Sequence, residues 1–466
     1  MKTKHISKRL LSLLLALIMA LGVVPVTAMA ANATVVSTTG GTLTSSETGT
    51  EGSYTLTATP DECYVFGKLE SSTDDGNSWS AVTVPAAGIT GTGATITVTP
   101  EADTQYRATF YSFSAAEAVP TAGGTFTVER SASKANQVKL SAVPAAGYIL
   151  GRWEYNENST GWKVVSGTAL SPTVTPATDT EYRAVFFAVT DTSDTSGTVA
   201  FSQGNAVGRV NVIITPPSGK VIGGLNKMEG ETPTSLASAS LSPGTSAPTA
   251  TLANYTISGD TGFSVTYNTA TDLTDGKLEF WPGTKPGQMN VKTTLEPNKF
   301  VASLTVDGAD FTIQPGVSGN NITFVNVPFS GDPNVNMTFF DVTATSVAGG
   351  SLILSQGQSR PGHVTATVTT NEGYVYGKLE LNTGGSTTNY ENPLTGSNSN
   401  TLTNIPLSGD TVIIPIFHKY EAADSVPASA PKVAVAVNGA DVSVKPDLAA
   451  TGYAFKKIEV STNDGS

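Results

Sequence analysis

One short pattern recurs along this chain and decides how the rest of it can fold. Gly67-Lys-Leu-Glu70 returns as Gly377-Lys-Leu-Glu380, and each copy follows a tyrosine, Tyr64 or Tyr374. Related segments give six copies, each with a large apolar residue five places after the tyrosine position: Leu69, Trp153, Leu225, Leu304, Leu379 and Ile458. These residues are 84, 72, 79, 75 and 79 positions apart. Such spacing predicts tandem structural repeats.

The spacing divides the chain into a leader and six repeats. We call the repeats 1 to 6; the leader is 1–30, and the repeats are 31–114, 115–190, 191–270, 271–343, 344–421 and 422–466. Repeats 3 and 4 are degenerate, because they keep little beyond spacing and alternation. Repeat 6 is truncated, since Ser461–Ser466 matches Ser72–Asn77 in the middle of repeat 1. We therefore expect the natural chain to continue beyond residue 466.

Each repeat has the residue alternation of short β-strands. In repeat 1, Tyr54–Ala58, Ala94–Thr99 and Gln105–Phe110 alternate apolar or aromatic residues with polar ones. A period of two is typical of half-buried strands, and no segment after residue 31 has a convincing helical face. The sequence predicts an all-β fold, in which small sandwich-like or barrel-like repeats of about 75 residues form an elongated rod.

The first thirty residues have the features of a secretory signal. Positive residues precede the apolar run Leu10–Leu21, Gly22 and Pro25 end it, and Ala28-Met29-Ala30 offers a cleavage site. The run is too short for the roughly 20 residues of a membrane-spanning helix. Cys63 is the only cysteine, so the exported chain has no internal disulfide. We expect a secreted protein, extracellular or at the cell surface or cell wall of a Gram-positive bacterium.

A family resemblance rests mainly on repeat 2. Its Gly123-Gly-Thr-Phe126, Ala146-Gly-Tyr-Ile-Leu-Gly-Arg-Trp153 and Asp179-Thr-Glu-Tyr-Arg-Ala-Val-Phe186 are the segments concerned. This pattern resembles the divergent internalin-type B-repeat of bacterial surface proteins. The resemblance implies an all-β repeat in secreted or wall-attached proteins, acting as a spacer or an adhesion element. It implies no catalytic residues.

We therefore predict a non-catalytic secreted or cell-surface repeat protein that serves as a stalk or spacer, with an added adhesion role. No catalytic, cofactor-binding or metal-binding residue is predicted, and no cofactor. A net charge of −12 without a basic stripe argues against nucleic acid as a partner. Expected partners are a host or cell-wall protein or glycan, and the chain is expected to be a monomer without a membrane span. Two alternatives stay open: a carbohydrate-binding array, and an appendage of an exported enzyme with its catalytic domain beyond residue 466.

One segment matches a known motif. Ser72-Thr-Asp-Asp-Gly-Asn-Ser-Trp79 resembles the Asp-box of sialidases and related propellers, which is a hairpin turn remote from their active sites. We interpret it as an Asp-Gly hairpin, in which the Asp74 side chain bonds to turn amides and Trp79 packs beneath.

Other reactive residues favour structural roles. Cys63 has no local histidine partner and is predicted to be a buried small residue. His363 and His418 lack ligand spacing, so a zinc site is not expected. Asp191-Thr-Ser-Asp194 and Asp272-Leu-Thr-Asp275 could hold calcium between repeats, but solvated acidic linkers fit better.

Aromatic residues of repeat 2 offer a possible sugar-stacking face. Trp153, Tyr155 and Trp162 flank one hairpin, but Trp153 matches the core leucines of other repeats, which favours packing in the core. Glycan binding that is lost with Trp162→Ala, but not with Trp79→Ala, would favour the carbohydrate-binding alternative. Lys–Asn isopeptide crosslinks are a further hypothesis for stability without disulfides, and each would remove one ammonia from the intact mass.

Overall fold

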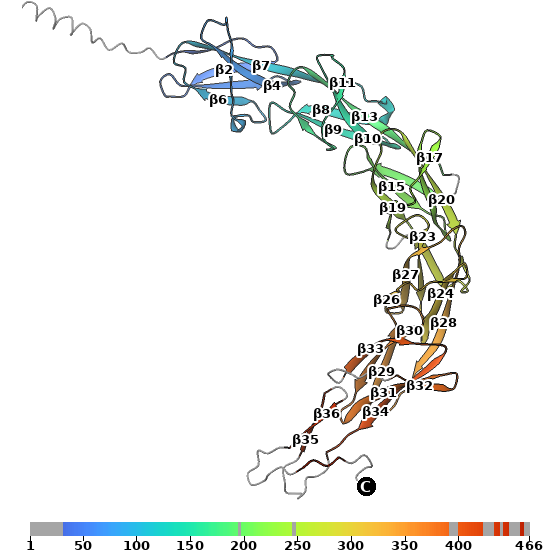
Figure 1. Cartoon of the computed structure of the whole chain (residues 1–466). Helices are drawn as coiled ribbons and strands as arrows, with labels where there is room; N and C mark the ends of the chain where they lie inside the picture. Colours follow the sequence, from blue (N-terminus) through green and yellow to red (C-terminus); the bar gives the residue numbers. More distant parts are fainter. Residues whose placement is uncertain are drawn as a thin grey trace, which may run out of the picture. The chain divides into compact units, whose positions relative to one another are not determined.

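The computed structural model of the chain describes residues 31–193, 197–244, 248–390, 399–422, 433–438, 441–446 and 457–460. The predicted signal peptide at 1–30 and the repeat 6 segment Ser461–Ser466 lie outside the described residues. The described part is built almost wholly of strands, with two short 3-10 helices at Ala86–Gly88 and Thr121–Gly123 (Figure 1). The predicted all-β fold of tandem repeats is confirmed.

Repeat 1 is a sandwich of two sheets. The first contains β2 (Gly41–Glu47), β3 (Tyr54–Pro60) and β6 (Ala94–Val98). The second contains β1 (Ala33–Val35), β4 (Tyr64–Ser72), β5 (Ser80–Val82) and β7 (Thr104–Ala115). Inward side chains of both sheets, including Leu56, Leu69 and Phe110, form one core. The alternating residues of these strands therefore bury one face each.

Repeat 2 has the same two-sheet plan. One sheet contains β8 (Gly124–Arg130), β9 (Val138–Pro144) and β12 (Thr173–Val174). The other contains β10 (Tyr148–Glu157), β11 (Trp162–Val164) and β13 (Thr180–Asp191). Trp153 is 2% exposed and packs edge-on against Phe126. Its predicted place in the core is confirmed.

Two compact units divide the described chain, and the boundary runs through repeat 3. One unit comprises residues up to 189 with 202–210 and 256–260; the other comprises 190–201, 211–255 and the residues from 261 onward. Repeat 3 contains β14 (Thr198–Gln203), β15 (Arg209–Thr215), β16 (Lys220–Glu229), β17 (Thr232–Ser235), β18 (Ser242–Pro243), β19 (Ala250–Thr256) and β20 (Thr261–Thr269). Strand β16 pairs antiparallel with both β17 and β20.

Repeats 4 and 5 keep the two-sheet plan, although repeat 4 is degenerate in sequence. Repeat 4 pairs β22 (Leu278–Pro282), β23 (Gln288–Thr294), β27 (Asn321–Pro328) and β26 (Gly316–Ser318) in one sheet. Its other strands are β21 (Thr271–Asp272), β24 (Lys299–Val306), β25 (Ala309–Asp310) and β28 (Asn334–Ala344). Repeat 5 pairs β29 (Gly350–Gln356), β30 (His363–Thr370) and β33 (Ser399–Pro406), opposite β31 (Tyr374–Thr383), β32 (Ser386–Tyr390) and β34 (Thr411–Lys419). Beyond them, β35 (Val433–Asn438) pairs with β36 (Asp441–Pro446).

The turn before the second sheet requires a left-handed residue in every repeat from 1 to 5. That residue is Cys63, Gly147, Gly219, Asn298 or Gly373, with φ between 62° and 81°. Glycine is the usual choice there because it has no Cβ to clash. Cys63 takes this conformation with an exposed side chain, so its predicted burial is wrong. The residue at this position is determined by the positive φ of the turn, and not by packing in the core.

Parallel pairing links successive repeats. We call β7, β13, β20, β28 and β34 the closing strands, because each is the last strand of its repeat. The end of β7 pairs in parallel with the start of β13, with Phe113 opposite Thr180. The end of β28 pairs in the same way with the start of β34, with Val342 opposite Thr411. A closing strand therefore continues past its own repeat and adds to the sheet of the next one.

Candidate functional site

The outer face of the second sheet of repeat 2 carries a charged and aromatic cluster. Glu154 of β10 receives a hydrogen bond from Arg152 Nε at 2.7 Å and from Arg183 Nε at 2.8 Å. The Arg183 guanidinium lies over the Trp162 ring, 3.9 Å from its centroid, and Arg152 lies 5.7 Å from the Phe187 centroid. We call these five residues the repeat 2 ladder. In order of contact, the ladder runs from Phe187 through Arg152, Glu154 and Arg183 to Trp162.

Repeat 1 carries the equivalent cluster at equivalent strand positions. The Glu70 carboxylate accepts hydrogen bonds from Lys68 Nζ at 2.8 Å and from Arg107 Nε at 2.9 Å. The Arg107 guanidinium lies over the Trp79 ring, 4.1 Å from its centroid. We call these four residues the repeat 1 ladder. Trp79 and Trp162 thus occupy matching positions. The sequence had instead suggested a difference between them, with only Trp162 as a candidate for sugar binding.

Cationic partners hold both ladder carboxylates in the charged form. For Glu154, burial raises the pKa, but the hydrogen bonds from Arg152 and Arg183 outweigh it and the net shift is downward. For Glu70, the Lys68 hydrogen bond is the main reason that the pKa is lowered, with Arg107 adding to it against burial. A carboxylate with a lowered pKa is a poor proton acceptor at neutral pH.

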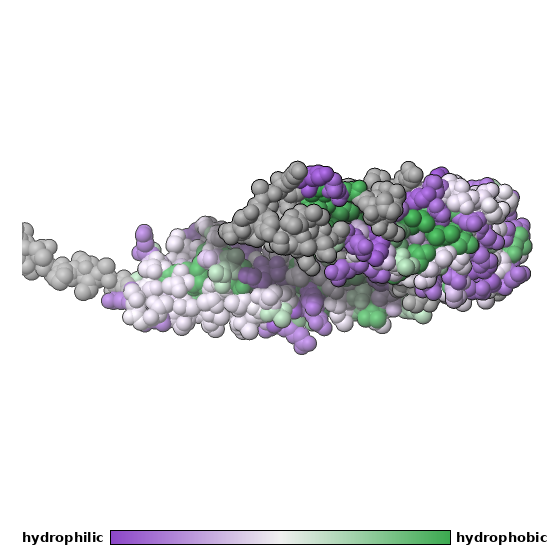
Figure 2. Space-filling view, turned by 90° about the horizontal axis from the view of Figure 1, so that it is seen from below, coloured by the Kyte–Doolittle hydropathy of each residue, from purple (hydrophilic) through white to green (hydrophobic). Residues whose placement is uncertain are grey.

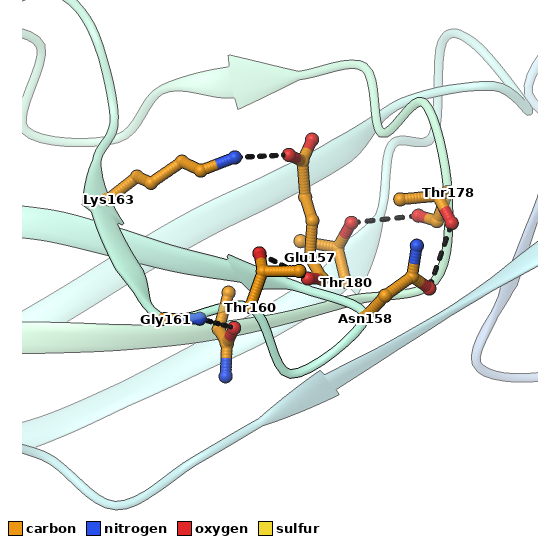
Figure 3. Close-up of polar contacts among 8 residues, drawn as sticks. Glu157, Asn158, Thr160, Gly161, Lys163, Thr178 and Thr180 are labelled. Carbon is orange, nitrogen blue, oxygen red and sulfur yellow. Dashed lines mark hydrogen bonds and ion pairs between the residues drawn. The ribbon is translucent and has the colours of Figure 1, made fainter.

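Beside the hairpin of β10 and β11 lies a half-open pocket of about 380 Å³. Tyr155, Glu157, Thr180, Tyr182 and the segment 172–176 line it. At its rim, the polar groups largely satisfy one another, as Figure 3 shows: Lys163 Nζ lies 2.9 Å from Glu157, and Thr180 Oγ1 donates to the Thr178 carbonyl.

Two pKa values at this pocket are raised. The hydrogen bond from Lys163 to Glu157 raises the pKa of Lys163, and burial raises the pKa of Tyr182 far above its usual value. At neutral pH the lysine therefore stays charged and the phenol stays protonated.

The Asp74 turn in repeat 1 is built as predicted. Asp74 accepts from the Ser72 hydroxyl at 2.7 Å, from the Ser78 amide at 2.9 Å and from the Ser78 hydroxyl at 2.6 Å. The Ser78 and Ser72 hydroxyl bonds lower its pKa to about 2. Trp79 Nε1 donates to the Gly76 carbonyl. Every one of these contacts stabilises a turn, and the hairpin interpretation is confirmed.

The residues considered for metal binding do not gather. In the described part of the chain, no three His, Cys, Asp or Glu side chains lie close enough to hold a metal. His363 contacts Arg360 and the Pro361 carbonyl instead. Asp272 accepts from the Thr274 and Leu278 amides and so shapes a turn, while Asp194 lies outside the described residues.

A lysine–asparagine contact bears on the crosslink hypothesis. Lys378 Nζ lies 3.0 Å from Asn389 Oδ1 on the neighbouring strand, with Glu380 also at 3.0 Å. The Lys378 and Glu380 side chains are 30% and 28% exposed.

Exposed hydrophobic side chains are scattered over several repeats; among the described residues, the largest exposed fractions belong to Val460, Val143, Ile353 and Val164. On the face in Figure 2, hydrophobic areas are interrupted by polar ones. Among the described residues, no helix is both long and apolar enough to cross a bilayer.

Two segments of the chain match a known family model, that of the divergent InlB B-repeat domain. The matches cover residues 31–114 and 114–190. Residues 31–190 are therefore similar to two tandem copies of this domain. The family resemblance predicted from the sequence is confirmed there. No curated protein matches the chain. B-repeats are generally non-catalytic and typical of extracellular or surface proteins.

Both ladders lie in the two segments that match the family model. The signal that could have revealed them is short: a cation two residues before a glutamate at 68–70 and 152–154, and Tyr-Arg-Ala in both closing strands. Nothing in the sequence alone says that these segments are neighbours in one sheet. That pairing aligns Glu154 with Arg183 across β10 and β13.

Proposed function

We propose that residues 31–466 form a non-catalytic spacer in a secreted or cell-surface protein, with the predicted division into six repeats. The observation that carries this proposal is the parallel addition of a closing strand to the sheet of the next repeat. Each such link combines covalent continuity with backbone hydrogen bonds. A junction of this kind resists bending better than a free peptide linker, because the chain cannot rotate without breaking those bonds.

The link also includes a second contact through the other sheet. The Gly208 amide donates to the Leu150 carbonyl, and Gln203 Oε1 accepts from the Leu150 amide at 2.7 Å. Gly362 and Gln356 make the same pair of contacts with Val301. Two separate contacts at one junction restrict both bending and twisting, which suits a spacer.

Small-angle X-ray scattering of the folded chain without residues 1–30 tests the spacer role. A compact protein of this length has a radius of gyration of about 22 Å, and an unfolded one about 77 Å. We expect an intermediate value well above 22 Å, together with the circular dichroism of β-structure. The same sample in guanidinium chloride is the unfolded control. A value near 22 Å would contradict the spacer proposal.

An adhesion role is proposed for the ladders, because both place a half-exposed tryptophan and a cation on an outer sheet face. Binding to host or cell-wall glycans and proteins is compared for the parent chain and for a Trp79→Ala/Trp162→Ala variant. We expect the double variant to lose binding, while Trp281→Ala, in β22, retains it. Equal binding by all three chains would remove the ladders from any adhesion role.

Export is proposed from the leader. Expression in a Gram-positive host should release a protein whose amino-terminal residue is Ala31, as N-terminal sequencing would show. An intact leader on the exported protein would contradict the proposed cleavage.

A further inference from the structure

The start of each closing strand offers the same binding site to an extended segment. Just before each closing strand lies an aspartate whose carboxylate accepts a backbone N–H from the incoming segment, at 2.7 to 2.9 Å. The aspartates are Asp103, Asp179, Asp260, Asp332 and Asp410. The donors are Asn32, Ser112, Ala188, Thr269 and Asp341. We call each aspartate with the first three residues of its closing strand a socket.

A second backbone bond recurs four residues further along the incoming segment. There, an N–H donates to a carbonyl of the closing strand at 2.8 to 3.0 Å. The five donor–acceptor pairs are Val36–Tyr106, Ala116–Tyr182, Thr192–Phe263, Leu273–Val335 and Thr345–Ile413. The socket therefore binds a five-residue extended segment through backbone hydrogen bonds, largely independently of its side chains.

One side chain of the incoming segment enters the core of the receiving repeat. Phe113 belongs to the core of repeat 2, Ala270 to that of repeat 4 and Val342 to that of repeat 5. Ala33 packs against the core of repeat 1 in the same position. The socket thus accepts side chains from alanine to phenylalanine at this point.

The occupant of the first socket is unlike the others. In repeats 2 to 5 the incoming segment continues from the preceding repeat, whereas in repeat 1 it is residues 32–36, which pair in parallel with β7. Residues 32–41 also align without gaps to residues 341–350, the segment that links repeats 4 and 5, with identical residues at four of the ten positions. Val35 and Val36 are 39% and 38% exposed, so this occupant is held mainly through its backbone.

We propose that residues 32–36 are a plug that fills, in repeat 1, a strand-addition socket built to receive the tail of a preceding repeat. The partner that this socket fits is an extended segment with the chemistry of a closing-strand tail. It has a free N–H at its first and fifth positions and an apolar residue at its second. When the plug is displaced, repeat 1 binds such a tail from another molecule.

Peptide binding to the full chain tests the proposal. In one variant, Asn32 and Val36 are both replaced by proline, which removes the two N–H groups that hold the plug in the socket. A fluorescent peptide with the sequence of residues 341–346 is titrated against this variant by anisotropy. We expect at least tenfold tighter binding to this variant than to the parent chain. Two controls should abolish the gain: a peptide with proline in place of Thr345, which lacks the second N–H, and Asp103→Ala in the socket. Equal binding to parent and variant, or undiminished binding of the proline peptide, would overturn the proposal.

A second measurement holds even if the double proline variant unfolds repeat 1. In the full chain, residues 32–36 are replaced by Asp-Val-Thr-Ala-Thr, the sequence of 341–345. Hydrogen exchange of residues 104–107 should stay within twofold of the parent, because the socket is built for this tail. Exchange that accelerates tenfold or more would show that the socket does not accept a tail, and would refute the plug assignment.

Discussion

Neutralising the carboxylate of the repeat 2 ladder should weaken that repeat strongly. The Glu154 side chain is 7% exposed, while its partners Arg152 and Arg183 are 38% and 24% exposed. Breaking a fully buried ion pair costs about 3–5 kcal/mol, and an exposed pair contributes about 0–1 kcal/mol. Because the carboxylate is buried but both cations reach solvent, we expect Glu154→Gln to destabilise repeat 2 by about 2 kcal/mol.

Repeat 5 provides a matched control. Glu380 lies at the position that corresponds to Glu154, but its side chain is 28% exposed and its cationic partner is Lys378 at 3.0 Å. A half-exposed lysine pair contributes less than about 1 kcal/mol. Glu380→Gln should therefore change the stability of repeat 5 by only a fraction of the change in repeat 2.

Hydrogen exchange with mass spectrometry measures both effects in the full chain. A loss of about 2 kcal/mol accelerates exchange roughly 30-fold, which should appear in the peptide covering β10 of the Glu154→Gln protein. The peptide covering β31 should accelerate less than about fivefold in the Glu380→Gln protein. If both substitutions accelerate exchange equally, burial of the carboxylate is not the source of the stabilisation.

The same ion pair gives a pH dependence with a definite sign. The pKa of Glu154 is lowered in the folded state, so its contribution is present above the unfolded value of about 4.3. The contribution is lost as the pH falls through the lower folded value. Exchange in β10 of the parent and of Glu154→Gln should therefore differ at pH 6 and converge in acid. A difference that persists undiminished in acid would contradict this linkage.

Three further predictions concern single positions. Cys63→Gly should stabilise repeat 1 by about 0.5–1 kcal/mol, because glycine adopts φ of 62° without strain, and denaturation followed by the repeat 1 peptides would show it. Gly151→Ala should destabilise repeat 2 by about 1–3 kcal/mol, since its Cβ would lie 2.6 Å from the Phe187 ring; Gly259→Ala, with open space around it, is the neutral control. NMR titration of the Asp74 carboxyl should give a midpoint near 2, and a midpoint near 3.8 would mean that the turn bonds do not hold in solution.

The repeat period and the strands can be predicted from the sequence, because both are patterns of residues that lie close together along the chain. A large apolar residue at a fixed distance from an aromatic one marked the position of Leu69 and Trp153, and both are buried. The Asp74 turn was also predictable, since a short acidic side chain bonds to amides within four residues. Such features depend on the chain nearby and not on what packs against it.

Errors arose where a residue type permits two explanations. A small residue at the position of Cys63 suggested burial, whereas the backbone angle of the turn decides the choice there. Trp162 was weighed as a special surface residue of repeat 2, but strand pairing places it in the same role as Trp79. Insertions of different length between the strands concealed that equivalence.

By itself, then, the sequence determined the tandem order, the all-β class, and which face of each strand is apolar. Only the tertiary structure decided which strands become neighbours across repeats. The sockets depend on which strands become neighbours. In the sequence, Asp179 is an ordinary acidic residue, 67 positions away from Ser112, whose backbone N–H donates a hydrogen bond to it. A backbone N–H has no sequence signature, since every residue except proline carries one. Contacts made by the backbone therefore become visible only when the strands are placed side by side.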